Sequence, residues 1–215
     1  MKITILGASG AIGALLVSRA AAAGHEVVAV SRGPLAAVPS GVRVERGSLS
    51  DVAFLTRTMQ GSDVVLSALG LRLPGLAPWH RPEVPDFLDT STAAIVQAMR
   101  QANVRRVLAV SSSGIGDSAP LLPGAFKVFI AVTAMRHAWP ALNRMEASYF
   151  ASGLDVTMVR PTGLSDGPAT GTIVEPTKLV GRAEISRADV ADWMLAEAAR
   201  AEVRRAVVIT TTGAA

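Results

Sequence analysis

The chain has 215 residues, half of them hydrophobic, which suits one α/β domain with a full core and excludes a disordered protein. It contains no cysteine, which excludes disulfides, thiolate catalysis and cysteine-ligated metal sites. The net charge of +4 comes mainly from arginines spread along the chain rather than from a basic run, so we expect no nucleic acid partner.

The N-terminal stretch has only the outline of a signal peptide. Lys2, the apolar residues after it and Ala20–Ala23 fit that outline, but Arg19 and three regularly spaced glycines interrupt it. No uninterrupted apolar segment is long enough to span a bilayer. We therefore expect a cytoplasmic monomer or homodimer without a membrane partner.

The most informative stretch is the glycine loop, Gly7-Ala8-Ser9-Gly10-Ala11-Ile12-Gly13, which lies between the apolar run 3–6 and a helical pattern at 14–20. This order predicts a strand, a tight turn and a helix. The turn leaves N–H groups of the helix N-terminus unpaired, and with the helix dipole they attract phosphate. Glycine is needed where a side chain would block the turn or the approach of a pyrophosphate. The loop therefore predicts a nucleotide site, with an ordinary strand-to-helix turn as the alternative. The expected contacts are Gly7, Ser9, Gly10, Ala11, Ile12 and Gly13.

The end of the second strand, predicted over 26–30, selects between the two nicotinamide dinucleotides. An Asp or Glu there bonds to the adenosine ribose of NAD, whereas an Arg suits the 2′-phosphate of NADP. This chain has Ser31-Arg32 and no carboxylate at that point. We therefore expect NADP(H) rather than NAD(H), with a solvated Arg32 as the alternative.

Alternating apolar patterns predict a Rossmann-like α/β fold over 1–215, a single domain with a doubly wound parallel sheet and helices on both faces. The remaining strands are expected over 42–46, 63–70, 104–110, 154–159 and 206–210, and the remaining helices over 51–60, 87–102, 138–152 and 186–201. Residues 118–136 suggest a loop with a short buried or pocket-covering helix, and 170–180 a short hairpin. We expect Arg144 and Glu146, in the middle of the helix 138–152, to be solvated.

Several short motifs occur in one order along the chain: the glycine loop, Ser31-Arg32, Ser67-Ala68-Leu69-Gly70, Ser111-Ser112-Ser113-Gly114 and the stretch Gly153–Leu164. In this the chain resembles the NAD(P)H-binding, NmrA-like atypical short-chain dehydrogenase/reductases, and among them the biliverdin reductase B/flavin reductase group. The resemblance implies a Rossmann fold with NADP(H) lying across the strand ends. Relatives carry Gly-Asp-Leu where this chain has Gly47-Ser48-Leu49, with the Asp near the adenine. The further cofactor contacts that we expect are Ser31, Arg32, Ser48, Leu49, Ala68, Leu69, Gly70, Ser111, Ser112, Pro161, Thr162, Gly163 and Leu164.

The chain departs from the superfamily in its catalytic residues. The superfamily pairs a general-acid Tyr with a Lys four residues later. Here Tyr149 is the single tyrosine, and Gly153 stands four residues on. Ser113 matches the superfamily serine and is our first catalytic candidate, with a structural turn hydroxyl as the alternative. His137 is the second, because its pKa range suits proton transfer, although a lone histidine is more often a capping or surface residue.

Two functions are open. The first is an NADPH-dependent oxidoreductase that passes hydride to a small acceptor such as a flavin or quinone, mainly by positioning it. The second is a non-catalytic NADP(H) redox sensor of NmrA type, favoured by the missing Tyr/Lys pair. An isomerase with tightly held cofactor is a third, weaker interpretation. The acceptor pocket is expected from about 71–86, 114–136 and 165–180. Asp117 and Asp166 lack a third clustered ligand, so we expect no metal.

Overall fold

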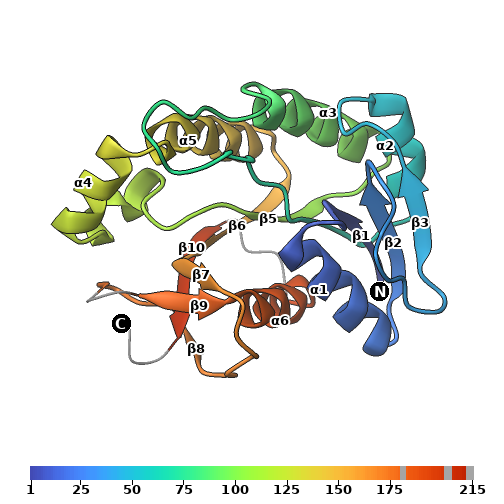
Figure 1. The fold of residues 1–215 in the computed structure, drawn as a ribbon. Coiled ribbons are helices and arrows are strands. Elements are labelled where there is room, and N and C mark those ends of the chain that lie inside the picture. The colour runs from blue at the N-terminus through green and yellow to red at the C-terminus, as the bar shows by residue number, and fades with distance from the viewer. Residues whose placement is uncertain (180–182, 201–204, 212–215) are drawn as a thin grey trace.

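The computed structural model describes residues 1–179, 183–200 and 205–211. The first half of the chain contains β1 (Lys2–Leu6), α1 (Ala11–Ala22), β2 (Glu26–Ser31), β3 (Arg43–Arg46), α2 (Val52–Met59), β4 (Val64–Ser67), α3 (Phe87–Gln101) and β5 (Arg106–Val110). The second half contains the 3-10 helix η1 (Gly116–Leu121), α4 (Gly124–Val132), α5 (Met135–Ala151), β6 (Asp155–Pro161), β7 (Gly163–Ser165), β8 (Ile173–Val174), β9 (Glu184–Ser186), α6 (Arg187–Ala198) and β10 (Arg205–Thr211). Strands β1–β6 and β10 and helices α1–α3, α5 and α6 follow the order that the hydrophobic patterns predicted (Figure 1).

Eight strands form the central sheet in the order β3-β2-β1-β4-β5-β6-β10-β8. All neighbours are parallel except β10 and β8, and β7 pairs with β9 in a separate two-stranded sheet. The strand order reverses direction between β1 and β4. In a doubly wound sheet this switch point leaves a crevice at the carboxyl ends of the strands. The predicted Rossmann-like fold is confirmed.

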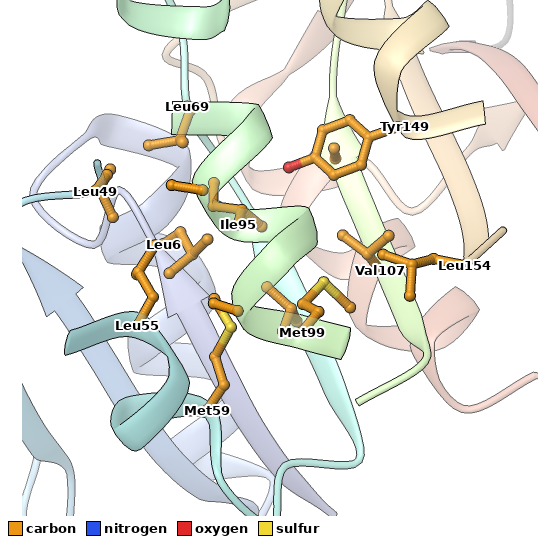
Figure 2. Packing of buried hydrophobic residues seen from close by; sticks show 14 of the residues in the cluster. Leu6, Leu49, Leu55, Met59, Leu69, Ile95, Met99, Val107, Tyr149 and Leu154 are labelled. Atoms are coloured by element: carbon orange, nitrogen blue, oxygen red, sulfur yellow. The ribbon is translucent and has the colours of Figure 1, made fainter. Parts of the chain in front are cut away.

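The two faces of the sheet are covered by different helices. Helices α1 and α6 lie together on one face, and α2, α3 and α5 lie on the other (Figure 1). Strand β1 shows why: Ile3 and Ile5 point to the first face and Leu6 to the second, as the two-residue period of a strand requires. Figure 2 shows Ile95 and Met99 of α3 packed among strand and helix residues of the second face.

The structure corrects the predicted hairpin over 170–180. Within its described part, 170–179, the only strand is β8, and it pairs with β10 rather than with a neighbour in the sequence. The prediction assumed a local turn, but the edge of the long strand β10 offers unpaired backbone groups and takes the segment instead. Val180 lies outside the described residues.

Asp189 anchors the 166–172 segment to the start of α6. Ser186 is the N-cap of this helix, and its hydroxyl accepts a hydrogen bond from Asp189 N. The carboxylate is fully buried and accepts hydrogen bonds from Thr170 N, Thr170 Oγ1, Gly171 N and Ser186 Oγ at 2.8–3.0 Å. Burial acts to raise the pKa of Asp189, but these hydrogen bonds outweigh it and hold the pKa below its ordinary value.

We expect Asp189→Asn to lower the free energy of unfolding at neutral pH by about 1–3 kcal/mol, because an amide cannot accept all these bonds. The folded-state pKa of the carboxyl lies below its unfolded value. Its stabilisation is therefore complete above the unfolded pKa, near 3.8, and is lost as the pH falls through the folded pKa. Urea unfolding at pH 7 and pH 3 should show the gap between the two proteins narrowing in acid. The control is Asp166→Asn, at an exposed carboxyl paired with Arg187. A gap that stays constant with pH would contradict this assignment.

Candidate active site

The glycine loop lies at the switch point, between the carboxyl ends of β1, β2 and β4. Gly7 has a φ of +79°, and a Cβ there would stand 2.9 Å from Ala68 O. A Cβ on Gly13 would stand only 2.1 Å from Gly7 O, so the first turn of α1 packs directly on the loop. Two hydrogen bonds set the turn: Gly10 N donates to Gly7 O, and Ala8 N to Val30 O. The glycines are therefore required by close backbone packing.

The N-terminus of α1 opens from this loop without a side-chain cap. Its N-cap residue is Gly10, and its first turn holds no acidic residue. The first N–H groups of a helix have no intrahelical acceptor, so they and the helix dipole favour an anion there. Ala8 and Ile12 are buried, whereas Ser9, Gly10 and Ala11 are exposed. This is the arrangement that a pyrophosphate needs.

The end of β2 forms one side of the crevice. Arg32 is exposed, and its guanidinium carbon lies 5.6 Å from the centre of the Phe87 ring. A small hollow beside it is lined also by Gly70 and Arg72, which follow β4. The Ser31 hydroxyl donates to Gly33 O at 2.5 Å. Arg32 is thus placed near the loop after β4 with its charged group open to solvent.

Ser48 and Leu49 lie just after β3. The Ser48 hydroxyl is bonded to the Ser50 hydroxyl at 2.8 Å, and Leu49 is buried in the core. Asp51 caps α2 by accepting a hydrogen bond from Phe54 N. Whether Ser48 contacts an adenine stays a prediction.

The other end of the crevice is built by the residues after β5 and β6. Ser111 N donates to Val159 O and Ser113 N to Pro161 O, at 2.7 and 3.0 Å, so the two segments continue side by side beyond the strands. Ser111 Oγ is buried and finds no hydrogen-bond partner among the described residues. A buried hydroxyl without a partner is costly, so it fits a polar ligand group at this edge.

A cavity of about 590 Å³ adjoins this end of the crevice. Its polar residues are Ser113, Thr162 and Glu184. Its apolar residues are Leu122, Pro123, Ala125, Phe126, Phe129, Leu164, Leu179 and Ala183, with Gly163 between them. The size and mostly apolar lining are typical of a small-molecule site. Two of the three predicted pocket segments, 114–136 and 165–180, contribute residues to it. None of the described lining residues comes from 71–86.

A buried ionic cluster lies under the segment after β5. The Arg160 guanidinium donates to both oxygens of Glu146 at 3.0 and 2.6 Å and also to Asp117. The side chains of Arg160 and Glu146 are only 4 % and 5 % exposed. The expectation that Glu146 is solvated is therefore wrong, because its carboxylate is paired with Arg160 of β6 in the protein interior. The hydrogen bond from Arg160 holds the pKa of Asp117 below its ordinary value.

Helix α5 presents further side chains to the same segment. Trp139 Nε1 donates to Gly114 O at 3.3 Å, and Asn143 Oδ1 accepts from Gly116 N at 3.1 Å. With Glu146 these residues stand four and three positions apart, which puts them on one face of the helix. The face of α5 nearest this segment thus fixes its backbone.

The two catalytic candidates are placed differently. Ser113 is buried and lines the 590 Å³ cavity. His137 lies in the first turn of α5 between Arg81 Nη1, at 3.4 Å, and Arg136 Nε, at 3.3 Å. It is not among the described residues that line this cavity, so the structure does not bring His137 and Ser113 together there. Both catalytic roles stay predictions. Asp117 and Asp166 each pair with an arginine, Arg160 and Arg187.

The model of the NAD(P)H-binding family matches residues 7–201. The chain belongs to this family. The match starts at the glycine loop, directly after β1, and runs into the segment after α6, so it includes the loop and the later strands that line the crevice. The residues of the crevice fit the family's dinucleotide: an uncapped helix N-terminus, a glycine cradle and a buried unpartnered hydroxyl lie along one edge of the sheet.

Two solved structures of other proteins have the same fold. ChuY, an anaerobillin reductase from Escherichia coli O157:H7, superposes with a TM-score of 0.78 at 24 % identity, over 100 % of this chain and 99 % of its own. A short-chain dehydrogenase/reductase from Veillonella parvula, solved in complex with NADP, gives 0.79 at 21 % identity, over 99 % and 95 %.

A curated relative, the uncharacterized protein Rv2047c of Mycobacterium tuberculosis, is 29 % identical over 112 residues. That match covers 52 % of this chain but only 12 % of the larger protein.

The single tyrosine of this NAD(P)H-binding protein does not reach the crevice. Tyr149 lies in the core between α5 and the sheet, near Val107 and Leu154 (Figure 2). It is 1 % exposed. Burial raises the pKa of its hydroxyl far above the ordinary value, against a smaller opposite effect of a hydrogen bond with Ser67. A hydroxyl held in the core cannot act as the acid of this site.

The sequence did not reveal two groups that shape the site. Glu184 lines the cavity from β9, and Trp139 holds Gly114 from α5. Neither belongs to a motif. For Trp139, the sequence offered one signal of a role: it lies one turn before Asn143 on an amphipathic helix.

Proposed function

We propose that the protein is an NADPH-dependent reductase that delivers hydride to a small, largely apolar acceptor such as a flavin or quinone. The observation that carries this is the cavity of about 590 Å³ that joins Ser113 to Thr162–Leu164, which by the family resemblance should lie near the nicotinamide. The family binds the dinucleotide, and a cavity for a second molecule lies beside the expected nicotinamide position. Together they favour hydride transfer to an acceptor over a non-catalytic redox sensor. The likeness to ChuY supports a reductase, while its own substrate is not carried over.

The residues expected to hold the dinucleotide divide by position. The glycine loop and the N-terminus of α1 would bind the pyrophosphate, and Arg32 would pair with the 2′-phosphate. Ser111 Oγ and the backbone after β6 would fix the nicotinamide half. Bound NADPH supplies the hydride and its two electrons.

The rest of the chemistry falls to positioning. The apolar walls, Phe126 and Leu164 among them, exclude water from an acceptor and hold its ring system flat against the crevice. Ser113 Oγ and Thr162 Oγ1 are the hydroxyls available to orient an acceptor oxygen. Thr162 Oγ1 already bonds to Thr210 Oγ1 at 3.0 Å, so Ser113 is the freer of the two. An acceptor that is already electrophilic needs no Tyr/Lys pair.

Arg32→Ala tests the cofactor assignment. We expect the wild type to bind NADPH at least about tenfold more tightly than NADH, since a charge-assisted contact contributes roughly 1.5–3 kcal/mol. Arg32→Ala should remove this preference and leave NADH binding unchanged. Fluorescence titrations with NADPH, NADH and NADP⁺ measure it.

The matched control is Arg57→Ala. Arg57 stacks on Phe54 at 5.9 Å much as Arg32 stacks on Phe87, but it lies in the last turn of α2, away from the carboxyl edge of the sheet. An unchanged preference in Arg32→Ala would remove the 2′-phosphate assignment. Multiple-turnover NADPH oxidation with a panel of flavins and quinones then tests the reaction. Tight NADPH binding with no turnover on any acceptor would favour the redox sensor instead.

A further inference from the structure

Helix α4 is apolar on all sides but is not buried. Its sequence, Gly124–Val132, carries one charged residue, Lys127, and none of its nine residues is buried. Phe126 and Ile130 contact a small cluster formed by Leu122, Leu179 and Val208. On the other side Val128 and Val132 are 62 % and 58 % exposed. A helix that is hydrophobic all round normally lies inside a core or in lipid, so this exposure calls for a partner.

A second exposed apolar segment lies next to α4. Ala134 N, just after the helix, donates to Leu76 O at 3.0 Å, and the Arg136 guanidinium donates to Pro78 O at 2.9 Å. Figure 1 shows the 71–86 segment crossing α5 toward α4. Leu76 and Trp79 of this segment are 53 % and 75 % exposed. We call Leu76, Trp79, Val128, Phe129 and Val132 the apolar face.

The charged residues within the two segments that carry the apolar face all have one sign. Residues 71–82 and 118–145 contain none of the 17 acidic residues of the chain. They contain Arg72, Arg81, Lys127, Arg136 and Arg144. Arg144 forms a salt bridge with Asp89 of α3. The acidic residues next to these segments in the sequence are Glu83, Asp117 and Glu146, and the last two are bonded to Arg160. The face is therefore apolar with a cationic surround.

We propose that this face docks the protein on the surface of an anionic lipid bilayer. Trp79 suits the interface, the aliphatic residues of α4 suit the acyl boundary, and Lys127, Arg81 and Arg136 suit anionic headgroups. A second copy of the chain, packed face to face, would bring the same cations of the two segments close to one another. A nucleic acid would leave the valines unburied. Among the described residues no helix is long and apolar enough to cross a bilayer, so contact is peripheral.

This revises the expectation of no membrane partner, which weighed only the length of apolar runs. A helix of nine residues is too short to span, yet it can lie in the interface plane. The exposure of α4 comes from tertiary structure and is not visible in the sequence. Val128 and Val132 are not among the described residues that line the 590 Å³ cavity, so lipid binding through them and hydride transfer can fail independently.

Cosedimentation of the full chain with vesicles tests the proposal. One set is phosphatidylcholine alone, and the other contains about one part in three of phosphatidylglycerol. We expect at least tenfold tighter binding to the anionic vesicles, weakened by added salt. The double variant Val128→Ser/Val132→Ser should lose at least tenfold, and Lys127→Glu about tenfold. Val38→Ser, at a 44 % exposed valine between β2 and β3, is the matched control and should bind like the wild type.

Three results would overturn the proposal. The first is failure of the wild type to bind either vesicle, and the second is binding that Val128→Ser/Val132→Ser leaves unchanged. The third is a dimer in sedimentation velocity that this double variant converts to a monomer, which would assign the face to a second copy. Because the substituted side chains are exposed, circular dichroism and Tm should match the wild type and exclude unfolding as the cause.

Discussion

Gly13→Ala should reduce NADPH affinity by about 100-fold and lower the stability of the protein. The Cβ would stand 2.1 Å from Gly7 O and 3.0 Å from Ala8 Cα, and both are backbone atoms of the loop that would hold the pyrophosphate. Relief requires the loop and helix to separate. Overpacking costs about 1–3 kcal/mol, and here it falls on the binding atoms themselves, so we expect the upper end in binding. Titration with NADPH, alongside thermal unfolding, measures both effects.

Gly124→Ala is the control for this substitution. A Cβ on Gly124, at the start of α4, meets no atom within 4 Å, so affinity and Tm should stay within error. If Gly13→Ala bound NADPH as tightly as the wild type, the packing of α1 on the loop would not define the nucleotide site. The proposed reductase function would then lose its structural basis.

Glu146→Ala should lower the free energy of unfolding by about 3–5 kcal/mol, because it leaves Arg160 buried with only one remaining carboxylate. Arg144→Ala, two residues earlier in the same helix, should cost about 1 kcal/mol or less. Its bidentate partner Asp89 is 32 % exposed, and Arg144 itself is 55 % exposed, so water takes the place of the lost contact. Urea unfolding of the two variants and the wild type gives the comparison.

Glu146→Gln refines the test, since it keeps the shape and removes the charge. It should lie between the wild type and Glu146→Ala. Equal stability of Glu146→Ala and Arg144→Ala would show that the cluster contributes no more than a surface pair. The stabilisation of the segment after β5 would then come from its other contacts, including those with Trp139 and Asn143.

The strands and main helices could be predicted because each has a local cause. Strand β1 carries the alternation of a sheet with helices on both faces, and Asp51 and Ser186 cap their helices by contacts three residues away. The glycine loop could be predicted for the same reason. Its requirement for small residues comes from backbone packing close in the sequence, between Gly7 and Gly13.

What the sequence could not predict depends on distant partners. Glu146 and Arg144 sit on the same helix, and only the position of Arg160 on β6 decides which is buried. The pairing of β8 depends on β10, which lies more than thirty residues away. Trp139 and Glu184 reach the site through the orientation of α5 and β9. Such contacts are set by tertiary structure and leave no periodic signal.

Helix α1, which opens the nucleotide crevice, is covered by the last helix of the described fold (Figure 1). Arg19 of α1 donates to Ala188 O of α6 at 2.9 Å and pairs with Asp192. Leu16 and Met194 belong to the same buried cluster. During synthesis, more than 160 further residues must therefore be added after α1 before α6 can cover it. A nascent chain should acquire nucleotide affinity only after α6 has left the ribosome, and the glycine-loop half should not work as a separate module.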